Sequence, residues 1–520
     1  MVLRALGTSV APIRPGRKPS GGRTELGMTD RHVVAVLAAG SLAIFAFAAL
    51  MRFNGGMSGD EPHYLAIVQA LIKYHTVDPT PVSVHGDYHS YYPPGALDEP
   101  HVFRGATGRA IPLHQFGGPL LWVLPFMVWG RFGVQLFMVA VSALIVVNAY
   151  YLQRELGIVR GYAAFVAGLF AIGTPLYMYS SMLFIEPIAA LLVIYAVRVL
   201  LARRLMPLRL VLASAGLGYL PWIHGRLIAF SLLLGALLAA RVTAEVGRDR
   251  VWPYVQALAP LGILLLGIEA FNLAAYGTLH PAPGAANIGA GLFQIPMFQG
   301  LTFMLLDARE GLLLLFPVLV LGFPGFLLSL HRRLAWAHVV ILATVLPYLL
   351  AIATYSVWWA GWSPPARFLS VVTPVLAYYV AVSLQRIHHW LLNSIALIAG
   401  LFALILSILS DVWWAERFVG VGDPVYKAWV HLGEFMHIDF VPFLPIALNG
   451  NAGHHLGLFI LWGLALLLFT LVTWLSGATT PQARVPDVAF PSFSRLVPPR
   501  FGQDKTAPRK NETAPAKTRP

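Results

Sequence analysis

Long apolar segments recur along almost the whole chain and predict membrane-spanning helices. A helix needs about 20 mostly apolar residues to cross the hydrocarbon core of a bilayer. Twelve segments come close to this length: residues 33–52, 133–152, 161–179, 183–202, 208–223, 227–241, 254–273, 311–330, 335–357, 368–385, 391–410 and 455–475. The pattern therefore predicts an all-α polytopic membrane protein with about 12 transmembrane helices.

The apolar stretch 117–131 is an exception, because it is too short to span a bilayer and contains Pro119 and Pro125. We expect a re-entrant or interfacial helix there. If this stretch does not cross, Lys and Arg concentrate in both tails and in the loops on the same side, as they do in cytoplasmic segments. Both termini are therefore predicted to be cytoplasmic.

This topology divides the chain into three regions. Residues 1–32 form a basic cytoplasmic tail, residues 33–476 the transmembrane domain, and residues 477–520 a disordered basic cytoplasmic tail. The first outer loop, residues 53–132, is long and rich in aromatic, histidine and acidic side chains. Loops of that length in a compact protein usually carry function, so we expect the chemistry on the outer face.

Composition narrows the functional classes. The 520 residues are 58% hydrophobic and only 11% charged, which excludes an ordinary soluble enzyme and a disordered chain. The net charge of +13 is typical of cytoplasmic loops and tails, and no nucleic-acid-binding motif accompanies it. The chain has no cysteine, which excludes disulfides, Cys-ligated zinc and thiol catalysis.

Two adjacent carboxylates, Asp60 and Glu61, closely follow the first predicted span. At the membrane boundary they must be solvated, paired or bound to a cation. Asp60 suits the N-cap of a helix and Pro62 its first turn, so residues 61–74 are expected to form an interfacial helix. Its membrane-facing stripe would consist of Leu65, Val68, Leu71 and Ile72. Taken alone, Asp60 is equally well explained as a helix cap.

The acidic pair followed by an interfacial helix resembles the GT-C superfamily of membrane glycosyltransferases, above all its protein O-mannosyltransferases and bacterial lipid A aminoarabinose transferases. Four further segments resemble this group in order and in membrane side: HQFGGPLL at 114–121, YSSMLFIEP at 179–187, LDAREGL at 306–312 and WWAGWSPPARF at 358–368. The resemblance covers most of residues 33–385. The chain lacks room for the luminal domain of the mannosyltransferases and lacks a Lys-Pro-Pro stretch after the acidic pair.

The resemblance implies a GT-C-like fold in a bacterial inner (plasma) membrane, with an extracytoplasmic active site. It implies that a hexose or pentose passes from a polyprenyl-phosphate donor to a lipid, glycan or protein acceptor. The catalytic acidic pair of the family maps onto Asp60 and Glu61. The acceptor itself does not carry over.

The expected reaction needs a base. A carboxylate on the acceptor hydroxyl removes its proton as the new bond forms, an effect worth about 10²–10⁴-fold in rate. Asp60 is the candidate base for an inverting displacement. Glu61 would orient Asp60, contact the sugar, or share with Asp60 a divalent cation such as Mg²⁺ or Mn²⁺.

The leaving phosphate gathers negative charge, which a guanidinium would stabilise. Arg367, Arg226 and Arg309 are the candidates. Interfacial snorkelling is the alternative for the first two, and a local salt bridge for the third. The remaining candidates for donor binding are His63, Tyr64, His114, Glu186, Asp307, Trp359 and Trp362. Glu186 is also explained as a helix-dipole partner, and the tryptophans as an interfacial belt.

Histidines and acids crowd the first outer loop, which raises the alternative of a zinc or manganese site. They are His63, His85, His89, His101, His114, Asp87, Asp98 and Glu99. Their spacing matches no established metal motif, so a hard cation on the oxygens of Asp60 and Glu61 is the preferred metal hypothesis.

A transporter or lipid-linked saccharide flippase is the rival interpretation. Twelve spans suit one, and Glu269 with Asn272 falls in a predicted span, where transporters place ionisable residues. The chain shows no internal repeat, and most of its other carboxylates lie in outer loops. The glycosyltransferase is therefore the preferred prediction.

Overall fold

The computed structural model covers most of the chain with defined elements. It describes residues 29–57, 59–97, 101–104, 107–173, 175–246, 250–279, 295–330, 335–418, 423–447 and 455–479. Almost all of both predicted tails lies outside the described residues, as do Asp98 and Glu99 of the proposed metal cluster.

Seven helical segments of the described chain are long and apolar enough to cross a membrane. They fall in α1 (Asp30–Asn54), α4 (Gly117–Glu155), α9 (Ile228–Val246), α10 (Val251–Tyr276), α15 (Ala335–Ala353), α17 (Trp390–Val412) and α19 (Leu456–Thr479). Each contains one of the predicted spans or most of it. The prediction of a helical membrane protein is therefore confirmed.

The other five predicted spans are shorter or broken helices, so the count of about 12 spans is not confirmed. They correspond to α5 (Arg160–Ile172), α6 (Leu176–Tyr179), α7 (Glu186–Leu201), α8 (Pro207–Ile223), α13 (Leu312–Leu315), the 3-10 helices η4 (Pro317–Leu321) and η5 (Phe368–Val371), α14 (Gly322–Ser329) and α16 (Thr373–Ile387). Pro175 and Pro317 follow two of the breaks, because proline disfavours a helical residue before it and lacks an N–H.

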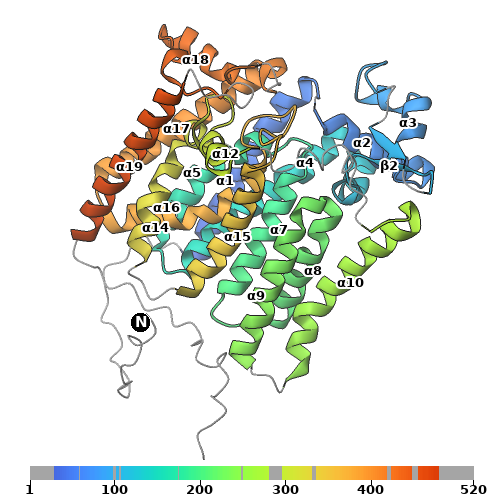
Figure 1. The fold of residues 1–520 in the computed structure, drawn as a ribbon, viewed down its shortest axis with the longest axis horizontal. Helices are drawn as coiled ribbons and strands as arrows, with labels where there is room; N and C mark the ends of the chain where they lie inside the picture. The colour runs from blue at the N-terminus through green and yellow to red at the C-terminus, as the bar shows by residue number, and fades with distance from the viewer. Residues whose placement is uncertain are drawn as a thin grey trace, which may run out of the picture.

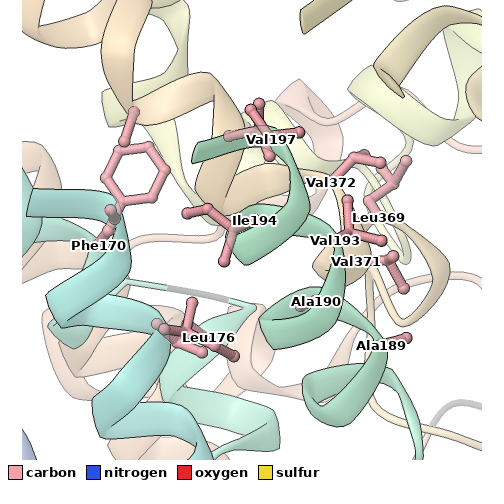
Figure 2. Packing of buried hydrophobic residues seen from close by; sticks show 14 of the residues in the cluster. Phe170, Leu176, Ala189, Ala190, Val193, Ile194, Val197, Leu369, Val371 and Val372 are labelled. Atoms are coloured by element: carbon pink, nitrogen blue, oxygen red, sulfur yellow. The ribbon is translucent and has the colours of Figure 1, made fainter. Parts of the chain in front are cut away.

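Helix α7 lies within the hydrophobic core of the protein, where its length is not set by the thickness of a bilayer. Figure 2 shows the α7 residues Ala189, Ala190, Val193, Ile194 and Val197 between two groups of apolar residues: Phe170 and Leu176, from α5 and α6, on one side, and Leu369, Val371 and Val372, in and directly after η5, on the other. Other segments of the protein, rather than lipid, cover most of the apolar surface of α7. A helix enclosed in this way need not match the bilayer thickness.

The elements of the segments predicted as outer loops gather at one end of the helical bundle (Figure 1). They include α2 (Glu61–Gln69), the π-helix η1 (Ala70–Tyr74), α3 (Thr80–Val84), the 3-10 helix η2 (Asp87–Ser90), strands β1 (Val102–Arg104) and β2 (Ala110–Pro112), α12 (Met297–Leu306) and α18 (Lys427–Met436). The two strands pair antiparallel, with Phe103 opposite Ile111. This small hairpin is a departure from the predicted all-α fold.

The prediction of an interfacial helix at 61–74 was wrong about its environment. The helix forms, with Pro62 in its first turn, but Leu65 and Val68 are fully buried in the protein core instead of facing lipid. Asp60 precedes the helix without making a side-chain capping bond. Its carboxylate has a stronger partner elsewhere, as described below.

The stretch 117–131 is the first arm of α4, which continues to Glu155. Trp129 and Gly130 interrupt the helical geometry, and Gly130 has a φ of 59°, which glycine adopts without strain. The first arm exposes an apolar stripe that includes Leu124, Met127 and Val128. A helix arm set off by this kink agrees with the predicted separate short helix, and its membrane depth stays a prediction.

The contact of α14 with α16 gives a test of this packing. A Cβ at Gly325 would come within 1.8 Å of the Tyr379 carbonyl oxygen, whereas at Gly322 the nearest atom, Cγ2 of Val380, is 3.9 Å away. Gly325→Ala should force the helices apart and lower the free energy of unfolding by about 1–3 kcal/mol. Gly322→Ala is the matched control and should not. Thermal unfolding in one detergent measures both, and equal melting temperatures would contradict this packing.

Candidate functional site

Four charged side chains from distant parts of the chain form one cluster, here called the Arg367 cluster. Arg367 Nη2 lies 2.6 Å from Asp60 Oδ2, and Arg367 Nε donates to Glu186 Oε1 at 2.8 Å. Arg226 Nη2 donates to the same Glu186 oxygen at 2.5 Å. The sequence singled out all four residues, and the structure brings them together.

Each member of the Arg367 cluster is placed by local backbone structure. Glu186 begins α7, and Arg226 lies in the 3-10 helix η3 (Gly225–Leu227), where its N–H donates to Nδ1 of the capping residue His224. Arg367 directly precedes η5. Gly59 before Asp60 has a φ of +60°, and a Cβ there would meet the Trp362 carbonyl oxygen at 2.2 Å. This close approach brings the Asp60 segment against residues 358–367.

Aromatic rings cover the two guanidinium groups. Arg367 lies 4.4 Å from the centre of the Phe184 ring, and Arg226 lies 4.2 Å from that of Phe368. Such cation–π contacts favour desolvated guanidinium groups. Sequence reasoning missed both phenylalanines, although each lies within two residues of a predicted site residue.

Asp60 is the accessible acid of the cluster. Its side chain is 25% exposed, whereas Glu186 is fully buried. Burial alone would raise the pKa of Asp60, but the ion pair with Arg367 opposes burial, and that pKa lies well below its usual range. Asp60 is therefore ionised at neutral pH and able to accept a proton.

Three histidines stack beside Asp60. The ring centres of His63 and His101 are 3.6 Å apart, those of His63 and His114 are 5.5 Å apart, and His114 Nδ1 lies 3.8 Å from Asp60. Tyr64 packs against His114 at 4.9 Å. Burial and the neighbouring imidazoles lower the pKa of His63 to about 3, and burial also lowers the pKa values of His101 and His114. The three rings are therefore neutral at pH 7.

Glu61 does not join the Arg367 cluster. Its side chain is 3% exposed, it accepts the Leu183 N–H at 3.0 Å, and it lies 3.9 Å from Arg417. Arg417 also lies 3.8 Å from Asp411, which Arg52 contacts at 2.7 Å. These residues form a second, buried group, the Asp411 network.

The Asp411 network has a structural role that the sequence did not reveal. Arg52 lies in the last turn of α1 and Asp411 near the end of α17, so their pair joins two helices through residues 359 positions apart in the chain. Arg52 also donates to Ser181 Oγ at 2.9 Å. A lone cation and a lone acid at the ends of two predicted spans were the available signal, because such groups inside a membrane protein need partners.

Asp307 anchors a third group, the Asp307 network. Its carboxylate accepts the N–H groups of Arg309, Glu310 and Ala447 at 2.9, 3.1 and 2.7 Å. Burial, opposed by these bonds, raises the pKa of Asp307 to about 6. Glu310 accepts the Ala366 N–H at 3.0 Å, so this network supports the residue before Arg367.

The predicted roles of Arg309 and the tryptophans are only partly met. The Arg309 guanidinium lies 5.3 Å from the Trp359 ring centre and 4.0 Å from Glu310, away from the pairs of Arg367. Trp362 is half exposed. The segment 358–367 wraps the site, with Tyr179 donating its hydroxyl to the Pro364 carbonyl oxygen.

The metal hypotheses gain no support from the geometry. Asp60 and Glu61 face different arginines instead of one shared point. Within the described residues, no group of three His, Cys, Asp or Glu side chains is arranged to hold a metal ion. His85 bonds Tyr74 and Pro81, and the left-handed Gly86 separates it from His89. We therefore derive no step through a metal.

An apolar groove of about 450 Å³ opens beside the Asp307 network. Residues of α12, α13, η4, α17, α18 and α19 line it, among them Leu306, Trp429 and Trp462. Figure 1 shows that α17, α18 and α19 form one side of the molecule. The groove is wide and apolar enough to accept a hydrocarbon chain.

The Asp411 network can be tested through stability. Asp411→Asn leaves Arg52 buried without its ionic partner, and breaking a buried pair in this way costs about 3–5 kcal/mol. Lys73→Gln is the control, because the Lys73–Asp87 pair is half exposed on its lysine side and is worth about 0–1 kcal/mol. Thermal unfolding of both variants checks the difference. A small loss for Asp411→Asn would show that this network does not hold α1 to α17.

Comparisons with known proteins add no assignment to this geometry. The chain has no match among protein-family models. It also has no significant match among curated proteins. The functional argument therefore rests on the arrangement of the residues and on the resemblance in sequence pattern.

Proposed function

We propose that the protein is a membrane glycosyltransferase of GT-C type that transfers a sugar from a polyprenyl-phosphate donor to an extracytoplasmic acceptor. One observation carries the proposal: an ionised, partly exposed Asp60 contacts Arg367, which shares Glu186 with Arg226. A base and a pair of phosphate-binding cations thus lie side by side. Displacement of a phosphate from an anomeric carbon requires both.

In the proposed reaction the donor phosphate takes over the outer side of Arg367. Asp60 then loses its ion pair and accepts the proton of the acceptor hydroxyl. The acceptor oxygen forms a bond to the anomeric carbon as the bond from that carbon to the phosphate oxygen breaks, with inversion. Arg367 and Arg226 stabilise the negative charge on the released polyprenyl phosphate.

Glu186 and Glu61 have supporting roles in this proposal. Glu186 is fully buried between two guanidinium groups, so it keeps Arg367 and Arg226 together when no donor is bound. Glu61 is reassigned from catalysis to positioning, because its carboxylate is buried on Leu183 and Arg417. It fixes the start of α2 and with it the neighbouring Asp60.

The environment of the site supports a lipid-carried donor. The apolar groove borders the Asp307 network, which bonds the backbone next to Arg367. We place the isoprenoid chain in this groove and the sugar at the Arg367 cluster. The proposed setting is a bacterial inner membrane with both termini cytoplasmic and the cluster on the outer face.

Asp60→Asn tests the base. The amide cannot accept the acceptor proton, so sugar transfer should fall by about 10²–10⁴-fold. Purified protein is incubated with a panel of polyprenyl-phosphate sugars, and released polyprenyl phosphate is measured. Asp78→Asn is the isosteric control, since Asp78 lies in the same loop and its carboxylate accepts the backbone N–H and the hydroxyl of Thr80, away from the Arg367 cluster. Full activity of Asp60→Asn would show that Asp60 is not the catalytic base. Translocation of the lipid-linked sugar without release of polyprenyl phosphate would favour a flippase.

Arg367→Gln tests the charge coupling through pH. The wild-type pKa of Asp60 is lowered by Arg367 against burial, so the acid limb of kcat/KM should lie below the usual aspartate range. Without the guanidinium, burial dominates and that pKa rises, so the acid limb of the residual activity should move to higher pH. The exposed Arg109→Gln is the control. An unmoved acid limb in Arg367→Gln would separate Arg367 from Asp60 in catalysis.

A further inference from the structure

A second cavity, of about 750 Å³, lies between the first outer loop and the kink of α4. Residues 89–94 form one wall, and Phe126 with residues 129–132 forms the other. Its lining is mixed, unlike that of the apolar groove beside α19. Aromatic rings alternate with Gln69, Ser90 and Arg131. Neither the Arg367 cluster nor the proposed isoprenoid groove uses this cleft.

Three side chains that line the cleft hold polar atoms without a hydrogen-bond partner among the described residues. They are Gln69 Oε1, the Tyr91 hydroxyl and Arg131 Nε. The Gln69 amide nitrogen is bonded to Asp87 and Ser90, and Arg131 Nη2 to the carbonyl oxygens of Arg52 and Gly55, so both side chains are held in place. Buried polar atoms normally find partners, and three orphans within residues that line one cleft favour a ligand at this place.

The chemistry of the cleft fits a saccharide. The orphan set combines an acceptor, a donor and a hydroxyl that does both, which matches sugar hydroxyls better than a simple anion. Tyr91 and Phe126 pack edge to face at 6.3 Å and offer apolar ring surface. Sugar hydroxyls that reach these buried atoms would complete their hydrogen bonding.

The rim of the cleft fits a lipid tail. Trp129 is 66% exposed and Phe53 is 45% exposed, and Phe53 ends the candidate span of α1. Trp at such a position is typical of the membrane interface. Leu124, Met127 and Val128 continue the exposed apolar surface along the first arm of α4. An amphiphile could therefore seat its headgroup in the cleft and its chain on this surface.

The cleft also borders the acidic pair. The Glu61 carboxylate lies within electrostatic range of Tyr92 and Arg131, both of which line the cleft. Gln69 ends α2 and Asp60 precedes it, so a helix of this length separates them by roughly 13 Å. A headgroup held at Gln69 must reach around the start of α2 to meet Asp60, which requires more than one sugar ring.

We infer that this cleft binds the oligosaccharide headgroup of a membrane-anchored lipid, which is the acceptor of the transfer reaction. The role as acceptor rests on the proposed function, whereas binding of the lipid does not. The donor and the acceptor then approach from different cavities, with the start of α2 between them.

Photo-crosslinking tests the inference without turnover. The full chain is purified in a detergent without sugar and placed in phosphatidylcholine nanodiscs. The probe is dodecyl maltoside with a diazirine in its alkyl chain, and mass spectrometry maps the labelled peptides. We expect label on Phe53 and residues 126–132. Excess dodecyl maltoside should compete, and excess dodecylphosphocholine at the same concentration should not.

Two conservative variants give the decisive comparison. Gln69→Leu and Tyr91→Phe should each reduce labelling by about fivefold, the effect of losing one hydrogen bond. Tyr254→Phe is the control, because it also removes one tyrosine hydroxyl, which donates to Thr243, but Tyr254 does not line the cleft. Its labelling should match wild type. Size-exclusion chromatography verifies that each variant is folded.

Two results would overturn the inference: unchanged labelling in both cleft variants, or equal labelling by a dodecylphosphocholine diazirine probe. The second result would make the surface an ordinary lipid contact. Expected labelling together with full activity of Asp60→Asn would keep the cleft as a glycolipid site and discard the proposed transfer mechanism. The two proposals therefore fail separately.

Discussion

The buried charge of Arg367 is the constraint on which the arrangement of the site depends. A guanidinium stays ionised even when buried, and leaving it without an anion in an apolar bundle is strongly unfavourable. Asp60 and Glu186 meet this requirement from two sides. Their pairing draws the first outer loop, the start of α7 and the segment before η5 to one point. The ion pair thus organises a site from segments separated by more than a hundred residues.

Among the Arg367 cluster, the Asp411 network and the Asp307 network, only the Arg367 cluster has a partly exposed carboxylate, that of Asp60. For this reason the proposed chemistry is assigned to Asp60, and the other two networks are assigned a structural role. In the Asp411 network, Arg52, Asp411 and Glu61 are almost wholly buried. In the Asp307 network, backbone N–H groups donate to both carboxylate oxygens of the buried Asp307. These two groups hold Glu61, next to Asp60, and Ala366, next to Arg367. In the proposed reaction, Asp60 exchanges its partner for a substrate while these neighbouring residues stay in place.

The two cavities differ in a way that agrees with two substrates of different chemistry. The groove beside α19 is apolar and fits the chain of the proposed donor. The cleft at the α4 kink combines aromatic rings with orphan polar atoms and fits a sugar headgroup. The kink at Gly130 contributes directly to this second cavity. The interruption of α4 is thus part of a proposed binding site as well as a bend in a helix.

Sequence patterns predicted most of the helices and many residues of the site, but they did not predict whether an apolar side chain faces lipid or the protein core. Asp60, Glu186, Arg226 and Arg367 converge as expected from their order and shared membrane side. Apolar periodicity could not show that Leu65 and Val68 face protein, because lipid and a protein core select the same residues. For the same reason it placed full spans where α7 and α16 are short, enclosed helices.

The chain alone determined that this is a helical membrane protein with most of its acids, and a few arginines, in the segments predicted as outer loops, since hydrophobicity and charge act locally along the sequence. Only the tertiary structure decided which acid meets which arginine. Glu61 and Asp60 are neighbours in sequence, yet one faces Arg417 and the other Arg367. Successive side chains of a helix point about 100° apart, so their partners are chosen by the surrounding helices and not by the adjacent positions.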